Sequence, residues 1–206
     1  MSDETEARDS KNSYKFDGLG TYTYAGYEID IGIDGLSELA VLKLLFNGEV
    51  ILEADSILSI SNMYESADEK CEIICFILYD EIIDQRNRGT LYTIIRRGEQ
   101  ITHHSIRVDN TAAPIIYNGN IFVVESLKLV SYPPSLKRIL SETLIITTDF
   151  LSGDFDYLDT YAISKVILLD HKLYLQYSSN AFKKSYYWYT GKIPDLKKKS
   201  LILLDN

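Results

Sequence analysis

The stretch AVLKLLFNGEVILEAD, residues Ala40–Asp55, decides the fold that we predict for this chain. Its centre, Asn47-Gly48, supplies the two residues of positive φ that a two-residue type I′ hairpin turn requires. Apolar runs flank the turn, so the stretch predicts two antiparallel strands. Counted outward from the turn, the predicted pairs are Phe46 with Glu49, Leu45 with Val50, Leu44 with Ile51 and Lys43 with Leu52. Apolar side chains then project from both faces of the hairpin, which predicts that other parts of the protein pack against each face.

The pattern of an apolar run, two turn residues and a second apolar run recurs along the chain. Further turns are predicted at Arg97-Gly98, Asn118-Gly119, Asp170-His171 and Thr190-Gly191. Residues 48–117 and 119–190 match in character, which indicates a possible internal repeat of about 70 residues. Consecutive hairpins predict an all-β, antiparallel fold, arranged as a sandwich, a barrel-like closure or a propeller-like set of sheets.

Helix is scarce in this interpretation, with one or two short helices at most. Residues 135–142 follow Pro133-Pro134 and form the best candidate, because Ser135 can cap a short helix. Residues 62–70 are either a turn of helix or a polar loop. Residues 1–13 are polar and acidic and predict a disordered tail, and no Pro/Gly/Ser-rich linker divides the single domain expected over residues 14–206.

Charge is distributed unevenly along the chain. The net charge is −9, but residues 161–206 carry eight lysines against three aspartates, so residues 1–160 carry −14. Such acidity repels nucleic acid and anionic membranes and steers a basic partner towards the body of the protein. An acidic surface also keeps a protein in solution without any partner, and both interpretations stay open.

Signatures of catalysis and metal binding are missing from the sequence. It holds no G-x-S-x-G, G-x-x-x-x-G-K-[ST], G-x-G-x-x-G or H-E-x-x-H motif. His103 and His104 are adjacent, so on a strand they point to opposite faces and cannot share a metal. Cys71 and Cys75 would lie about 13 Å apart on a strand, too far for a disulfide, and we expect buried, reduced thiols. No catalytic residue, cofactor or metal is therefore predicted.

Two stretches are candidates for binding a partner. The first, TDFLSGDFDYLDTY, interleaves carboxylates with aromatic rings and suits docking onto a basic protein; its candidate residues are Asp149, Asp154, Phe155, Asp156, Tyr157 and Asp159. A solvated loop and a cation-binding loop are the alternatives. The second, SYYWYTGK, places Tyr186 and Trp188 on one face of a strand, which either binds a ligand or belongs to a core or edge strand.

These observations together favour a non-enzymatic binding protein of the cytoplasm. The acidic body and the lack of catalytic motifs are typical of an immunity protein or antitoxin that neutralises a basic toxin by direct binding. A carbohydrate- or ligand-binding β module that uses the Tyr/Trp face is one alternative, and a hydrolase with an unrecognised carboxylate pair is the other. The N-terminus is acidic where a secretion signal would be basic and then apolar, and no apolar run approaches the ~20 residues of a membrane span.

Overall fold

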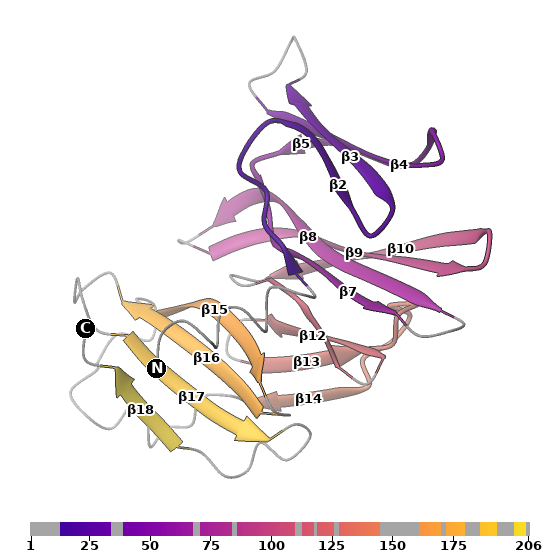
Figure 1. The fold of residues 1–206 in the computed structure, drawn as a ribbon. Coiled ribbons are helices and arrows are strands. Elements are labelled where there is room, and N and C mark those ends of the chain that lie inside the picture. Colours follow the sequence, from indigo (N-terminus) through magenta and orange to yellow (C-terminus); the bar gives the residue numbers. More distant parts are fainter. Residues whose placement is uncertain are drawn as a thin grey trace.

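The computed structural model describes residues 13–33, 39–67, 71–83, 86–109, 113–117, 119–125, 128–144, 161–169, 172–179, 186–192 and 200–204. Within these ranges the chain is all-β and antiparallel, as predicted, and contains no helix. The strands form four sheets in which neighbours along the chain are mostly neighbours in space (Figure 1). Short local connections of this kind are what consecutive hairpins produce.

Each sheet takes its strands from one continuous part of the chain, apart from the short β1. Sheet 1 has the order β2-β3-β4-β5, with β2 (Gly20–Tyr24), β3 (Tyr27–Ile33), β4 (Ala40–Phe46) and β5 (Glu49–Ile57). Sheet 2 has the order β1-β7-β8-β9-β10, with β6 also on β8; the bounds are β1 (Ser13–Tyr14), β6 (Ser59–Ile60), β7 (Met63–Ala67), β8 (Glu72–Ile83), β9 (Arg86–Arg97) and β10 (Gln100–Asp109).

The second half of the chain forms the remaining two sheets, again in sequence order. Sheet 3 contains β11 (Ile115–Tyr117), β12 (Asn120–Glu125), β13 (Lys128–Tyr132) and β14 (Ser141–Leu144). Sheet 4 contains β15 (Tyr161–Leu169), β16 (Lys172–Ser179), β17 (Tyr186–Lys192) and β18 (Ser200–Leu204). Four-stranded meanders of this type are also the units of β-propellers.

Strand β8 lies at the centre of the packing because both of its faces are buried. Successive side chains of a strand point to opposite faces. Ile74 and Phe76 pack with the apolar face of sheet 1, whereas Cys75 and Ile77 pack with β12 and β13 of sheet 3. Sheet 2 therefore lies between sheets 1 and 3 (Figure 1).

The hairpin at Asn47-Gly48 is confirmed, but its predicted register holds for only two pairs. Asn47 and Gly48 have φ of 52° and 81°, and Leu45 pairs with Val50. Ile51 is then an extra residue, so Leu44 pairs with Leu52 and Lys43 with Glu53. This β-bulge places both leucines on the buried face. Val50 is 50% exposed, so the prediction of cover on both faces is wrong for this part of the hairpin.

The other predicted turns have different outcomes. The predicted pairing of Ile116 with Ile121 is confirmed, and Leu169 pairs with Lys172. Of the turn residues predicted between these strands, Asn118, Asp170 and His171 lie outside the described residues. The turn near Gly98 lies one residue later than predicted because Arg97 pairs with Gln100, and Gly98 takes the first turn position with φ of 62°. The turn predicted at Thr190-Gly191 is wrong: β17 continues to Lys192 between β16 and β18, and this pairing on both sides overrides the glycine signal.

The predicted short helices are also wrong. After Pro133 the chain makes a turn, in which the Leu136 amide donates to the Pro133 carbonyl at 2.9 Å. Leu136 has φ of 54° and is buried in the core between sheets 2 and 3, and that burial prevents a helix there. Residues 63–67 of the other candidate form β7, paired with β8. Residues 1–12 of the predicted tail lie outside the described residues, and the repeat and the single domain stay predictions.

The part of the chain that the structure describes has no helix of the length and apolarity needed to cross a membrane.

Candidate functional site: an acidic groove

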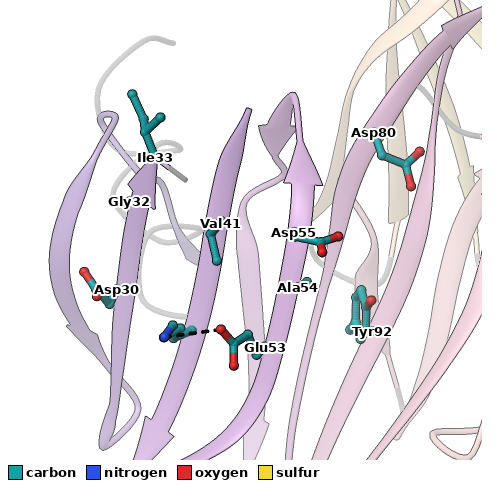
Figure 2. Close-up of a pocket in the computed structure, with 10 residues that line it drawn as sticks. Asp30, Gly32, Ile33, Val41, Glu53, Ala54, Asp55, Asp80 and Tyr92 are labelled. Atoms are coloured by element: carbon teal, nitrogen blue, oxygen red, sulfur yellow. Dashed lines mark ion pairs between the residues drawn. The ribbon is translucent and has the colours of Figure 1, made fainter. Parts of the chain in front are cut away.

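A groove of about 730 Å³ runs from sheet 1 across its edge strand β5 to sheet 2 (Figure 2). Its charged lining consists of four carboxylates and one ammonium group, from Asp30, Glu53, Asp55, Asp80 and Lys43. The groove is therefore strongly negative. Because its walls are protein, the field of these carboxylates is focused more than it would be on a flat surface.

The wall contributed by sheet 1 is a row of charged side chains across three strands. Asp30 on β3 faces Lys43 on β4, which in turn faces Glu53 on β5. Lys43 Nζ lies 3.2 Å from Glu53 Oε1, and Thr21 Oγ1 donates to Asp30 Oδ1 at 3.3 Å. Both members of the Lys43–Glu53 pair are exposed, so it contributes about 1 kcal/mol or less to stability. One lysine compensates only part of the charge of this wall.

Two β-bulges lie beside the groove and carry its other aspartates. On β5, Leu42 pairs with Ala54 and Ala40 with Ile57, so Asp55 and Ser56 together oppose one residue. On β8, Tyr79 pairs with Gly89 and Glu81 with Arg88, so Asp80 is extra. An extra residue bends a strand and redirects its side chains, which is why bulges are frequent next to binding sites. Regular strands would present these two aspartates differently.

Gly89 is required for the bulge at Asp80. A Cβ atom at this position would lie 2.2 Å from the Leu78 carbonyl oxygen, a distance that real Cβ contacts do not reach. Every other residue type would therefore push the two strands apart. Glycine inside a strand is disfavoured on its own, and a close approach of backbones is one of the reasons that it occurs.

Asp80 is oriented by Arg107 of β10. The guanidinium binds Asp80 Oδ2 through Nη1, and Nη2 lies 3.3 Å from Glu81 Oε2. The hydrogen bond to Asp80 is the main reason that the pKa of Arg107 is raised. Asp80 Oδ1, in contrast, is buried and has no hydrogen-bond partner among the residues that the structure describes. Arg107 therefore fixes the orientation of Asp80 and compensates part of its charge.

Tyr92 of β9 lies beside the aspartates of both bulges. Its ring stacks on Phe76 at a centroid distance of 5.6 Å and an interplanar angle of 18°. Burial raises the pKa of Tyr92, and the nearby charges of Asp80 and Asp55 raise it further. Figure 2 shows Asp55 and Asp80 on the same side of the groove as Tyr92. The site therefore combines two carboxylates with an aromatic ring, a set that suits an organic cation.

A second charged cluster lies between the same two sheets and shows how this chain holds a guanidinium. Arg96 forms an ion pair with Glu72. Its guanidinium carbon lies 5.7 Å from the Tyr27 ring centroid and 5.0 Å from that of Phe46. Arg96 belongs to sheet 2 and both rings to sheet 1, so this arginine bridges the sheets by cation–π contact, while its ion pair with Glu72 lies within sheet 2.

Cys75 is completely buried and forms no disulfide, as predicted. Cys71 is only half-buried, so the prediction of burial is wrong for that residue; it immediately precedes β8 and packs against the core between sheets 2 and 3. Among the described residues no group of three or more His, Cys, Asp and Glu side chains is arranged to hold a metal ion. The aspartates of the groove therefore do not form a metal cage.

The binding residues predicted from the acidic and aromatic stretch lie outside the described residues; they are Asp149, Asp154, Phe155, Asp156, Tyr157 and Asp159. Tyr186 and Trp188 are described as part of β17, which pairs with β16 on one side and β18 on the other. The strand is consequently an inner strand of sheet 4, not an edge. Sequence reasoning missed the groove, although one signal was available in Gly89, an isolated glycine between two strand-like runs.

Comparison with known proteins gives little further information. No family model matches the chain, and no curated protein matches it. Among solved structures, the chain is similar to one titled "Crystal structure of HIRA(644-1017)", with 14% sequence identity and a TM-score of 0.37. The match covers 93% of this chain and 53% of that chain, so this chain spans about half the length of the solved one.

Proposed function

We propose that this protein is a non-enzymatic, cytoplasmic binding protein that neutralises a basic partner protein, in the manner of an immunity protein or antitoxin. The acidic groove carries this proposal. Four carboxylates line it against one lysine, and Asp55 is exposed with no ion pair among the described residues. Such a surface attracts a positively charged protein and repels nucleic acid and anionic membranes.

The charge of the whole body supports the same proposal. Residues 1–160 carry −14, and the groove lies within them. Long-range attraction of this size accelerates association with a basic partner and weakens as salt shortens the Debye length from about 10 Å at 0.1 M to about 3 Å at 1 M. An inhibitor benefits from rapid association, because the toxin must be captured before it acts.

The test uses the full chain as bait in lysate of its source cells, at about 0.1 M and about 0.5 M salt. We expect the wild type to retain a basic protein at low salt and to lose it at high salt. The variant Asp55→Asn/Asp80→Asn should retain less of it, whereas the control Glu99→Gln, at the tip of the β9–β10 hairpin, should behave as the wild type. Co-expression should then suppress the toxicity of that partner.

Two results would contradict the proposal. One is retention that is insensitive to both salt and the double substitution, because the groove would then not be the docking surface. The other is a captured partner whose toxicity is unchanged by co-expression, which would leave a binding protein but remove the neutralising role.

A further inference from the structure

We propose that β10 is a dimerisation strand, which pairs antiparallel with β10 of a second copy of this chain. The strand lies at the edge of sheet 2 and pairs only with β9 among the described strands (Figure 1). In an antiparallel ladder alternate residues direct their amide and carbonyl groups to the same side, so the outer side of an edge strand carries a row of unpaired groups. The proposal does not depend on the acidic groove or on the proposed function.

The first argument is that nothing in β10 itself prevents the addition of another strand. It spans ten residues, Gln100–Asp109, and all ten pair with β9 without a bulge. The strand contains no proline and no lysine, and Ile101, Thr102, Ile106 and Val108 are β-branched residues that favour strands. Natural proteins shorten an edge strand, bend it with a bulge or place proline and charge on it, because an unprotected edge pairs with other chains.

The other long edges of the described chain show the contrast. β5 has nine residues, two bulges and the carboxylates of Glu49, Glu53 and Asp55. β15 also has nine residues, with a bulge after Ile163 and a lysine at position 165. The remaining edge strands have five residues or fewer. Among the described strands, β10 is therefore the one long edge without a bulge.

The second argument is that the formal charges of β10 are used within sheet 2. Arg107 pairs with Asp80 and Glu81 of β8. Asp109 Oδ1 lies 3.7 Å from Arg88 Nε of β9. Because both charges are compensated by neighbouring strands, neither strongly repels an added strand. β10 is thus a nearly neutral edge on an acidic body, so two copies repel each other less along β10 than elsewhere.

The third argument is that β10 suits a second copy of itself. A twofold axis makes each β10 the partner of the other, so one pairing uses both free edges. The central residues His103, His104 and Ser105 include no lysine, arginine, aspartate or glutamate, so no such like charges meet near the axis. The opposite edge of sheet 2 is β1, which has only two residues and is too short to continue the pairing. The result is a closed dimer and not a fibre.

The experiment measures the mass of the full chain by sedimentation equilibrium across the micromolar range, at about 0.1 M and about 0.5 M salt. A single pair of strands is a small interface, so we expect a weak, reversible dimer. It should be at least as tight at the higher salt, because salt screens the repulsion between two acidic bodies and leaves backbone hydrogen bonds in place. This salt dependence is opposite to the one expected for capture of a basic partner by the groove.

Ser105→Pro is the variant that should block the dimer. Arg97 and Gln100 flank a two-residue turn as a hydrogen-bonded pair, so by alternation the amide of Ser105 points away from β9. Proline at this position removes a donor from the outer edge only, which an edge strand tolerates. We expect the Kd of the dimer to rise about tenfold or more, whereas the matched control Ser105→Ala keeps the amide and should leave the Kd unchanged.

Hydrogen exchange of the wild type gives a second measurement that needs no substitution and decides the matter if Ser105→Pro unfolds. Protection of the β10 amides should rise with protein concentration, whereas protection of the β5 amides should not. A chain that stays monomeric, or a dimer that a folded Ser105→Pro variant leaves intact, would overturn the inference. Protection of β10 only in the complex with a captured protein would identify that protein as the occupant and would also overturn it.

Discussion

Replacing Gly89 by alanine should strongly destabilise the protein, because the added methyl group meets backbone atoms. The Cβ would lie 2.2 Å from the Leu78 carbonyl oxygen and 2.9 Å from its carbon. Relief needs a shift of about 1 Å between β8 and β9, and flexible side chains cannot provide it. Overpacking typically costs about 1–3 kcal/mol, and a collision with backbone should reach about 3 kcal/mol. For a chain of this length that corresponds to a fall in Tm of about 6–12 °C.

Thermal unfolding followed by circular dichroism measures this effect, with Gly32→Ala as the matched control. Gly32 lies in β3, and a Cβ added there meets nothing within 4 Å, so alanine should be neutral or stabilise by less than about 1 kcal/mol. Equal melting temperatures of the two variants would refute the reasoning.

Three further predictions concern the hairpin turn, the thiols and the pH dependence. Asn47→Ala should lower the free energy of unfolding by about 1 kcal/mol because alanine disfavours the φ of 52°. Asn47→Gly should leave it nearly unchanged, and equal losses in the two variants, measured by urea denaturation, would argue against this turn. Burial raises the pKa of the Cys75 thiol, so Cys75 should resist a thiol reagent in the native protein while the half-buried Cys71 reacts; rapid labelling of both would contradict the packing. Burial, and then the charge of Glu72, raises the pKa of Glu65, so the folded state holds its proton more tightly than the unfolded state does. Stability should therefore decline as pH rises above the ordinary glutamate pKa of about 4, and Glu65→Gln should remove that component, which urea denaturation at several pH values detects.

Local chemistry accounts for the parts of the fold that were predictable. Alternating apolar runs and the Asn-Gly turns at residues 47 and 118 determine strand identity and the position of a turn, because both depend on neighbours in the chain. The strand expected around Cys71 and Cys75 is likewise present as β8, whereas the burial of both of its faces is a finding of the structure. Where tertiary packing competes with a local signal the prediction failed, as at Leu136, whose burial replaces a helix by a turn, and at Thr190, where pairing with two strands extends β17.

The acidic groove depends on relationships that only the folded chain contains. Its members Asp30, Asp55, Asp80 and Tyr92 are separated by long stretches of sequence and meet because β5 of one sheet lies next to β8 and β9 of another. Bulges at Asp55 and Asp80 then set the direction of those side chains, and a bulge shifts register by one residue, which a period-two pattern does not resolve. Amino-acid composition alone determined that the body is acidic. The tertiary structure decided where that charge is concentrated, because the packing of two sheets brings distant carboxylates around one ring.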